Sequence, residues 1–387
     1  MTRRVLVAGG GTAGHVFPAL AVARALTVLD PGIEPVFVGV PDRLEADLVP
    51  AAGFRIHHVD AVAVPRRIST KLLRLPGAVR SAVRRCEEIV EEEGALGVVT
   101  FGGYVSFPVS WAAARRDLPL VIHEQNAVPG LANRVSSRWA DRIAVTVPGS
   151  ADRFRRAERA AVTGNPVRQE VLELDRAARR AAARERFGLQ PDLPTLLVFG
   201  GSQGARQLNR AIVDALARWR TDRLQVLHAA GRSLFAESAA AWERARASAG
   251  GGPTSRLVDF IDDMSDAYAA ADVVVCRAGA TSIAELTVLG VPAVLVPYPH
   301  ATGDHQTRNA EALANAGGAV MVSDDELDGA SLVAAVEPLL TDPERHAAVA
   351  AAARAFGRPD AATNVARLLL DLLPATRKQP DDPEGST

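Results

Sequence analysis

The sequence is poor in the features that mark several common protein classes. Only two cysteines, Cys86 and Cys276, occur in 387 residues, so we expect neither a disulfide framework nor a four-ligand zinc site, and a reducing cytosol is favoured. No uninterrupted apolar run reaches the roughly 18 residues that a membrane-spanning helix needs. The first residues, MTRRVLVAGGG, lack the apolar region of a signal peptide. The formal net charge is −1, so no overall field attracts nucleic acid. We therefore expect a soluble or peripheral protein without a nucleic-acid partner.

Short apolar runs alternate with helix-length segments along most of the chain. RVLVAGG from Arg4, PVFVGV from Pro35, LGVVTFGG from Leu96 and LPLVIHEQ from Leu118 have the continuous apolar character of buried parallel strands. A second series begins with TLLVFGG at Thr195 and continues with LQVLHAAG, ADVVVCRAG and VPAVLVPYP. Each series opens with a glycine-rich strand-to-helix turn, which predicts an α/β protein with two doubly wound, Rossmann-like domains.

The turn-rich segment GNPVR, from Gly164 to Arg168, separates the two series. The Arg- and Ala-rich stretch from Asp175 to Phe187 is predicted to form a helix that leads into the second domain. The predicted division is an N-terminal domain of residues 1–163 completed by an amphipathic segment, 359–373, a C-terminal domain of residues 164–358, and a proline-rich, disordered tail, 374–387.

Gly9, Gly11 and Gly14 form a GxGxxG pattern directly after the first predicted strand. Glycine lets the backbone turn tightly and approach an anion, while the N–H groups and the dipole of the following helix favour negative charge. The same pattern binds NAD where a carboxylate ends the second strand, but Asp30 lies before that strand and Asp42 beyond it. The loop therefore favours another phosphate-containing ligand, and a glycine turn with no ligand is the alternative.

The stretch GGSQGA, which contains Ser202, places a GxSxG pattern between a strand and a helix. This pattern also fits the nucleophile elbow of a serine hydrolase, for which Asp272 with His300 or His305 would complete a triad. Because a second glycine-rich α/β domain precedes it, the stretch is more simply a phosphate cradle in which the Ser202 hydroxyl donates to a phosphate oxygen. The hydrolase stays open as an alternative.

The segment RAGATSIAEL places small residues at a predicted helix start, and Glu285 follows one turn later. A carboxylate there can accept both hydroxyls of a ribose, while the free N–H groups before it hold a phosphate. A glutamate that only complements the helix dipole is the alternative.

Taken together, the motifs resemble one family. GGGTAGHVFP, FGGYVSFP, HEQNAVPG, GNPVR, GGSQGA, FIDDM, CRAGATSIAE and GDHQTRNA follow the order found in the MurG-type N-acetylglucosamine transferases of peptidoglycan synthesis. The resemblance runs from about Val5 to Ala310 and implies a glycosyltransferase B (GT-B) fold. It also implies inverting transfer of N-acetylglucosamine from UDP-N-acetylglucosamine to the 4-hydroxyl of undecaprenyl-diphospho-N-acetylmuramoyl-pentapeptide, which converts lipid I into lipid II. The donor is then expected mainly on the C-terminal domain and the acceptor on the N-terminal one.

The resemblance further implies which residues bind the substrates. They are Thr12, Ala13 and Gly14 beside the donor sugar and acceptor diphosphate, Asn126 at the transferred sugar, Arg168 and Ser202 at the donor diphosphate, Ile261 at the uracil, Ala280, Thr281, Ser282 and Glu285 at the α-phosphate and ribose, and His305 and Gln306 at the sugar.

Two of these positions depart from the family pattern. The family often has glycine at the position of Ala13, and a methyl group fits there only if the backbone φ is negative. His305 stands where the family often has another glutamine.

His15, just after the first glycine loop, is the candidate general base, because a neutral imidazole accepts a proton near physiological pH. A structural role or diphosphate binding is its alternative. The leaving UDP would be stabilised by helix N-termini, Arg168 and Ser202. No carboxylate pair of the DxD type stands out, since Asp262 and Asp263 are adjacent and belong by resemblance to the uracil side. We expect no cofactor and no obligatory catalytic metal.

Basic residues without an acid gather between Pro65 and Arg85, interleaved with apolar ones. Such a segment suits contact with anionic headgroups, and an ordinary solvated helix is the alternative. We expect a peripheral protein at the cytoplasmic face of the cell membrane, with UDP-N-acetylglucosamine, lipid I and an anionic membrane surface as partners and cell-wall synthesis proteins as further candidates. The predicted membrane-contact residues are Arg66, Arg67, Lys71, Arg74, Arg80, Arg84 and Arg85.

Other functions stay open from the sequence besides the hydrolase. One is a different GT-B nucleotide-sugar transferase or an epimerase with a soluble substrate. Another is a UDP-sugar-binding module without catalysis.

Overall fold

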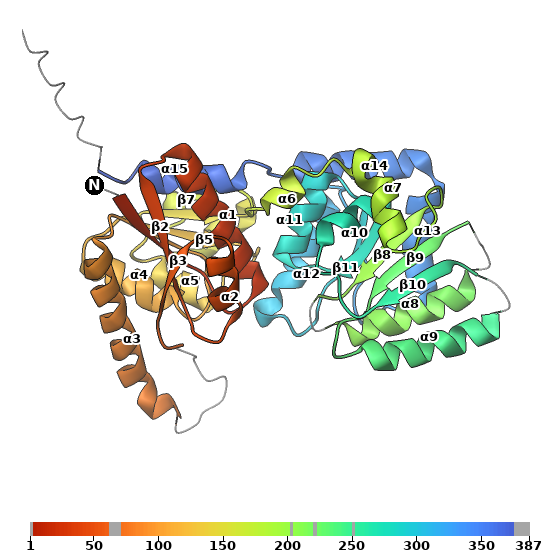
Figure 1. Ribbon diagram of the computed structural model, residues 1–387, viewed down its shortest axis with the longest axis horizontal. Coiled ribbons are helices and arrows are strands. Elements are labelled where there is room, and N and C mark those ends of the chain that lie inside the picture. Colours follow the sequence, from red (N-terminus) through yellow and green to blue (C-terminus); the bar gives the residue numbers. More distant parts are fainter. Residues whose placement is uncertain (1–2, 62–70, 202–203, 220–222, 250–251, 375–387) are drawn as a thin grey trace, which may run out of the picture.

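The computed structural model describes residues 3–61, 71–201, 204–219, 223–249 and 252–374, with only the backbone of residues 71–74 and 248–249. Two α/β domains lie beside each other, each built on one twisted sheet flanked by helices (Figure 1). Every strand pair in both sheets is parallel. The predicted fold class, two doubly wound α/β domains, is confirmed.

The N-terminal sheet has the strand order β3-β2-β1-β4-β5-β6-β7. Its central strands are buried on both faces, because helices cover them on each side, which explains their continuous apolar sequences. The strands are β1 (Arg3–Ala8), β2 (Ile33–Gly39), β3 (Arg55–His58), β4 (Val98–Thr100), β5 (Leu120–Glu124), β6 (Arg142–Val145) and β7 (Ala160–Val162). The helices are α1 (Ala13–Leu29), α2 (Leu44–Ala51), α3 (Lys71–Glu93), α4 (Ser106–Arg115) and α5 (Leu131–Ser136), with short 3₁₀ turns at η1 (Pro148–Arg153) and η2 (Ala157–Arg159).

The C-terminal sheet has the strand order β10-β9-β8-β11-β12-β13. Its strands are β8 (Thr195–Phe199), β9 (Gln225–Ala229), β10 (Thr254–Val258), β11 (Val273–Arg277), β12 (Ala293–Val296) and β13 (Val320–Met321). The helices of this domain are α6 (Gln169–Leu172), α7 (Arg176–Arg186), α8 (Arg206–Arg218), α9 (Phe235–Ala249), α10 (Met264–Ala270), α11 (Ala280–Leu289), α12 (His305–Asn315), α13 (Gly329–Thr341) and α14 (Pro343–Phe356), with a short 3₁₀ turn at η3 (Thr302–Asp304). The chain then continues into α15 (Ala361–Leu370).

The helix predicted between Asp175 and Phe187 is α7. Asp175 is its N-cap, because the Asp175 side chain accepts hydrogen bonds from the backbone N–H groups of Ala177 and Ala178.

The last helix, α15, returns to the N-terminal domain and packs beside α1 (Figure 1). Val365, Ala366 and Leu369 of α15 are buried in the same apolar cluster as the strand residues Val5 and Val7. A segment from the end of the described chain therefore completes the core of the first domain. The predicted tail lies outside the described residues, apart from Pro374.

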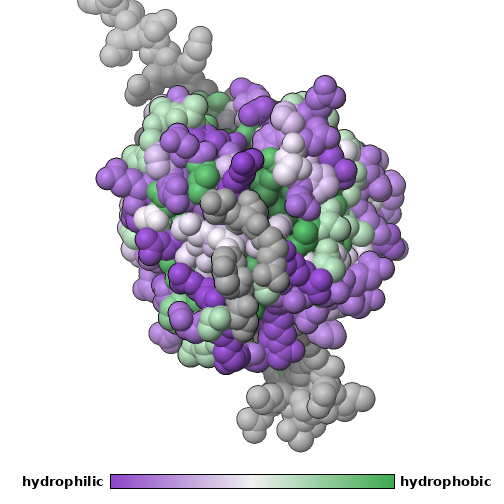
Figure 2. Space-filling model, turned by 90° about the vertical axis from the view of Figure 1, so that its right-hand side faces the viewer, coloured by the Kyte–Doolittle hydropathy of each residue, from purple (hydrophilic) through white to green (hydrophobic). Residues whose placement is uncertain are grey.

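The outer end of the C-terminal domain is mostly hydrophilic, and its apolar residues form small separate groups (Figure 2). In the part of the chain that the structure describes, no helix combines the length and apolar character needed to cross a bilayer. Cys86 and Cys276 are both buried as free thiols, and burial raises the pKa of each to about 12.

Candidate active site between the two domains

The first glycine loop joins β1 to α1, with Thr12 as the helix N-cap. Gly11 has a φ of +85°, a conformation that favours glycine. Ala13 is the first residue of α1 and is absent from the positive-φ residues, so its methyl group is free of backbone strain. Gly14 already lies inside the helix. The departure at Ala13 therefore leaves the loop intact.

A buried glutamate that sequence reasoning missed supports this loop. Glu45, in the first turn of α2, is fully buried, and its carboxylate accepts hydrogen bonds from Gly11 N at 2.8 Å and Val40 N at 3.1 Å. A Cβ atom at Gly10 would clash with the same carboxylate. In the sequence, Glu45 reads as one of several acids near a helix start, and only the fold places it beneath the loop.

His15 lies above the loop with one ring nitrogen turned toward the backbone. Its Nδ1 is 3.1 Å from the carbonyl oxygen of Gly10 and 3.1 Å from Thr12 Oγ1. A carbonyl only accepts, so Nδ1 carries the proton and Nε2 keeps a free lone pair. Burial lowers the pKa of His15 below its ordinary value, and the imidazole is therefore neutral at physiological pH. These are the properties required of a general base.

The HEQN segment at the end of β5 forms the next part of the site. Glu124 is buried, which raises the pKa of its carboxyl group, and it accepts hydrogen bonds from the backbone N–H groups of Asn126 and Gly130 at 2.9 and 3.0 Å. It thereby fixes the loop that carries Asn126. Sequence reasoning gave Glu124 no role, although it is part of the HEQN motif.

Asn126 also lies at a direct junction between the domains. Asn309 of α12, in the C-terminal domain, accepts from Ala127 N at 2.8 Å and donates to Asn126 Oδ1 at 3.2 Å. Its amide is buried and also donates to the carbonyl of Ala278 at 3.2 Å. Asn309 belongs to the GDHQTRNA motif, but the sequence did not identify it as a contact across the domain boundary.

The C-terminal domain contributes Glu285, which is only 2% exposed. Arg168 contacts Glu285 Oε1 at 2.8 Å, and the Tyr268 hydroxyl donates to Oε2 at 2.8 Å. Burial raises the pKa of Glu285, while Arg168 and Tyr268 oppose that shift. The guanidinium of Arg168 also lies 4.8 Å from the ring centre of Phe17 in α1. The structure thus brings together Arg168 and Glu285, which were predicted to bind different parts of the donor.

The backbone of Tyr268 is hydrogen-bonded to an arginine of the neighbouring helix α7. Arg176 of α7 donates through Nε to the carbonyl oxygen of Tyr268 at 3.0 Å and also contacts the carbonyl oxygen of Ala271. These carbonyls end α10, where a cation is favoured by the helix dipole.

Two helix N-termini approach each other between the domains. Ala280, Thr281 and Ser282 form the first turn of α11, and no side chain caps this turn. A Cβ atom on Gly14 in α1 would lie 3.9 Å from Thr281 Oγ1. No side chain caps either first turn, and such uncapped helix N-termini are a usual environment of a bound phosphate.

The remaining predicted donor residues that the structure describes contact neighbouring segments of the C-terminal domain. His305 and Gln306 begin α12, where His305 Nδ1 is 2.9 Å from Thr302 O and Gln306 Oε1 accepts from Tyr298 N at 3.0 Å. Ile261 is buried in the apolar core after β10. Ser202 lies outside the described residues.

The basic segment is described only in part. Arg66 and Arg67 lie outside the described residues, and the side chains of Lys71 and Arg74 in α3 are not described. The helix lies along the outer side of the N-terminal domain (Figure 1). Arg80 and Arg84 are exposed, and Arg84 pairs with Glu88 at 3.3 Å. Arg85 pairs with Glu92 at 2.8 Å and Glu88 at 3.3 Å, so part of the predicted basic surface is neutralised within the helix.

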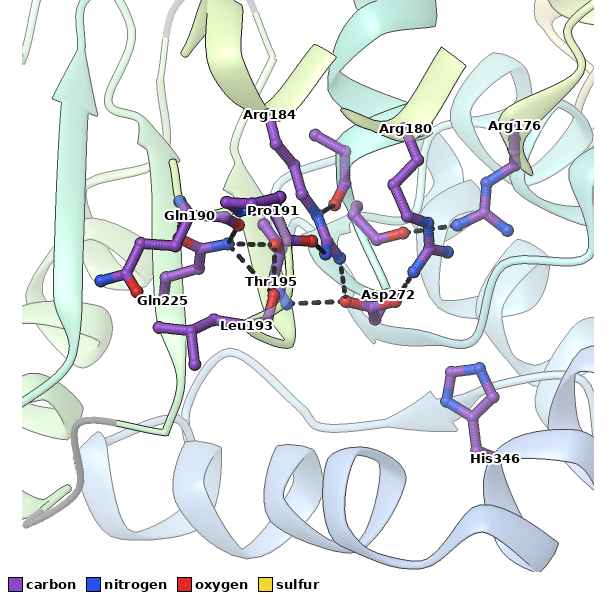
Figure 3. Close-up of polar contacts among 12 residues, drawn as sticks. Arg176, Arg180, Arg184, Gln190, Pro191, Leu193, Thr195, Gln225, Asp272 and His346 are labelled. Carbon is purple, nitrogen blue, oxygen red and sulfur yellow. Dashed lines mark hydrogen bonds and ion pairs between the residues drawn. The ribbon is translucent and has the colours of Figure 1, made fainter. Parts of the chain in front are cut away.

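The triad nominated for the hydrolase alternative is wrong, because its acid, Asp272, lies at the amino end of β11, beside Arg184 and Thr195 (Figure 3). Asp272 precedes β11 and contacts Arg180 at 2.6 Å, Arg184 at 2.7 Å and the backbone N–H of Thr195 at 2.7 Å. Thr195 begins β8, whereas the glycine turn follows the end of that strand, about 17 Å away for five residues. His300 and His305 follow the carboxyl end of β12. Asp272 therefore cannot orient either histidine.

The chain is similar to one group of known proteins. Residues 5–145 match the glycosyltransferase family 28 N-terminal domain, and residues 195–365 match the glycosyltransferase family 28 C-terminal domain. A relative from Nocardioides sp. is 46% identical over 369 residues, covering 95% of this chain and 98% of that protein. One from Acidothermus cellulolyticus is 46% identical over 373 residues, covering 96% and 99%. Both are named UDP-N-acetylglucosamine--N-acetylmuramyl-(pentapeptide) pyrophosphoryl-undecaprenol N-acetylglucosamine transferase. The crystal structure of Acinetobacter baumannii MurG matches with a TM-score of 0.75 and 30% identity, covering 95% of this chain and 99% of that one.

Proposed function

This chain belongs to glycosyltransferase family 28, and we propose that it transfers N-acetylglucosamine from UDP-N-acetylglucosamine to the 4-hydroxyl of undecaprenyl-diphospho-N-acetylmuramoyl-pentapeptide. Relatives that cover nearly the whole chain carry this activity in their names. The observation that carries the proposal is the contact between a cluster of polar side chains on the C-terminal domain and the glycine-loop region of the N-terminal domain. Arg168, Glu285 and Tyr268 form a donor-type cluster on one domain, and Arg168 contacts Phe17 of α1, the helix that follows the glycine loop of the other domain.

Donor binding uses groups that already contact each other. The ribose hydroxyls donate to the Glu285 carboxylate, each oxygen of which has a further lone pair beside its present partner. Competition for this carboxylate weakens its contact with Arg168. The guanidinium can then turn toward the diphosphate, for which a planar, permanently charged group is well suited.

The transfer step requires one proton acceptor and stabilisation of the leaving group. The acceptor oxygen attacks the anomeric carbon, and Nε2 of His15 takes the hydroxyl proton. As the new carbon–oxygen bond forms, the bond to the β-phosphate oxygen breaks, and its electron pair leaves with UDP. Attack opposite the leaving group inverts the anomeric centre. Arg168 and the N-termini of α1 and α11 stabilise the negative charge that develops on the diphosphate.

The decisive experiment supplies both substrates to the purified protein. UDP-N-acetylglucosamine and a short-chain lipid I analogue are incubated with it, and both released UDP and the disaccharide product are measured. A matched pair of variants links turnover to the site: Glu285→Gln changes the donor cluster, and Glu243→Gln changes an exposed glutamate on α9. Release of UDP without disaccharide, or formation of an epimerised sugar without the acceptor, would refute the assignment in favour of a hydrolytic or epimerase activity.

We further propose that α3 brings the enzyme to the anionic cytoplasmic face of the membrane. The support is the exposed basic pair Arg80 and Arg84, whose side chains lie on the outer helix of the acceptor domain. At about 1 kcal/mol for each basic residue near the surface, replacing both by alanine weakens vesicle binding by roughly 30-fold.

Flotation with vesicles that contain or lack anionic lipid tests this. The matched control replaces Arg210 and Arg218, which are exposed on α8 of the other domain. Equal binding to neutral vesicles, or equal losses in both double variants, would contradict an electrostatic role of α3.

A further inference from the structure

Glu45 is a buried charge without an ion-pair partner among the described residues. Its carboxylate is fully buried, and its hydrogen bonds come from two backbone N–H groups, those of Gly11 and Val40. Glu93 of the same domain instead pairs with Arg55 and His57, whereas Glu124, like Glu45, is held by backbone N–H groups. Burial of an unpaired carboxylate is costly.

Two glycines leave the space that the Glu45 side chain occupies. Side chains are absent at Gly10 and Gly39, and a Cβ atom at either position would press against the Glu45 side chain. The carboxylate consequently reaches the first glycine loop directly. Its position links the end of β2 to the turn after β1.

Glu45 and His15 contact opposite ends of the same peptide group. The N–H of Gly11 donates to Glu45 Oε2 at 2.8 Å, and the C=O of Gly10, in the same peptide unit, accepts from His15 Nδ1 at 3.1 Å. The peptide unit is planar and conjugated. A carboxylate that polarises its N–H makes its carbonyl oxygen a stronger acceptor, because linked hydrogen bonds strengthen one another.

We propose that Glu45 is a positioning residue for His15 that acts through the Gly10–Gly11 peptide group. Glu45 orients the Gly10 carbonyl, which keeps the proton of His15 on Nδ1, so that Nε2 is free to accept the proton of the acceptor hydroxyl. The negative charge of Glu45 also stabilises the imidazolium that forms during transfer. This inference rests on the proposed role of His15 in catalysis.

The groups around His15 set its pKa, and the pKa should therefore change when Glu45 is replaced. Glu45 on α2 raises the pKa of His15, whereas burial and His305 on α12 lower it. His123 on β5 is neutral, since burial lowers its pKa to about 4. A Cβ atom at Gly102 would lie 3.0 Å from His15 Nε2 and 3.6 Å from the neutral amide nitrogen of Asn133. The hydrogen bond to the Gly10 carbonyl also raises the pKa, and loss of the Glu45 charge removes one of these two raising influences, so the pKa of His15 falls.

The test compares Glu45→Gln with Glu45→Asp and with Glu93→Gln as a control for loss of a buried carboxylate in the same domain. The pKa of His15 is followed by NMR titration, and kcat and KM are measured across pH. Glu45→Gln is expected to lower the His15 pKa, move the acidic limb of kcat to lower pH and reduce the plateau roughly tenfold, a modest part of what general base catalysis supplies. The KM for UDP-N-acetylglucosamine is expected to stay within about twofold, since substrate-binding groups are untouched. Glu45→Asp keeps the charge and is expected to recover part of both effects.

An unchanged His15 titration in Glu45→Gln would overturn the proposal, as would an equal fall of kcat in Glu93→Gln. The NMR titration needs no substrate, so it separates this inference from the proposed activity. If the parent protein fails to transfer the sugar while Glu45 still controls the His15 pKa, the assigned reaction is wrong and the link between the two residues stands. If Glu45→Gln does not fold, Glu45→Asp decides: its shorter side chain weakens the contact with Gly11, so a smaller fall of the His15 pKa and of kcat is expected, and an unchanged titration overturns the proposal.

Discussion

Replacement of Glu285 by glutamine should separate donor affinity from fold stability. The carboxylate is buried between Arg168 and Tyr268, and burial raises its pKa, which means that the charged form is costly in the folded protein. Glutamine has nearly the same shape but no charge. It removes this cost while it also removes the ion pair with Arg168. The two effects oppose each other, so the melting temperature should change little.

The donor, in contrast, loses its charged acceptor. A hydrogen bond to a charged group contributes about 1.5–3 kcal/mol. Glutamine keeps one neutral carbonyl oxygen for the two ribose hydroxyls, so we expect a loss of about 2–3 kcal/mol. At 1.4 kcal/mol for each tenfold change, UDP affinity should fall roughly 30- to 150-fold. Tyr268→Phe removes only the donor to Oε2 and should give a smaller loss, roughly fivefold.

Isothermal titration of UDP measures the affinity directly, and thermal unfolding of the free proteins measures stability. Glu243→Gln on the outer helix α9 is the matched control and should match the parent protein in both. UDP affinity within twofold of the parent in a folded Glu285→Gln protein would refute the donor site. A large fall in melting temperature without a change in affinity would identify Glu285 as structural instead.

Other outcomes follow from contacts elsewhere. Asn309→Ala removes the partners of Ala127 N and Asn126 and should reduce kcat/KM about tenfold with little change in UDP affinity; equal kcat/KM would contradict a role for this junction. Burial lowers the pKa of His228 to about 3, so only the unfolded chain gains its proton below about pH 6.5. Stability should therefore fall as the pH drops from about 6.5 toward 3, and His228→Gln should weaken that dependence in melting curves; an unchanged slope would show that other groups cause it. Turnover should persist in excess chelator, and complete loss that Mg²⁺ restores would show a required metal.

The strands and the glycine turns could be predicted because they depend on local sequence. Continuous apolar runs become strands buried on both faces, and the glycine at position 11 adopts the positive φ that the tight turn requires. Arg168 and Glu285, which the motif order assigned to the donor, contact each other in the structure, and their binding of the donor stays a prediction.

Contacts between distant segments could not be predicted. Glu45 supports a loop more than thirty residues earlier, and Asn309 bridges to a segment from the other domain. Asp272 illustrates the reverse case, because its sequence position fits a triad while the strand direction places it beside Arg184. In each example the residue type was visible, but its partner depended on strand order and domain packing.

The return of α15 to the first domain has a consequence for folding during synthesis. Val5 and Val7 are synthesised well before Val365 and Leu369, with which they share an apolar cluster. The apolar surface of α1 that α15 covers therefore stays exposed until the whole second domain has been translated. A chain that stops before α15 should therefore have a first domain that is prone to aggregation, even though every strand of its sheet is present.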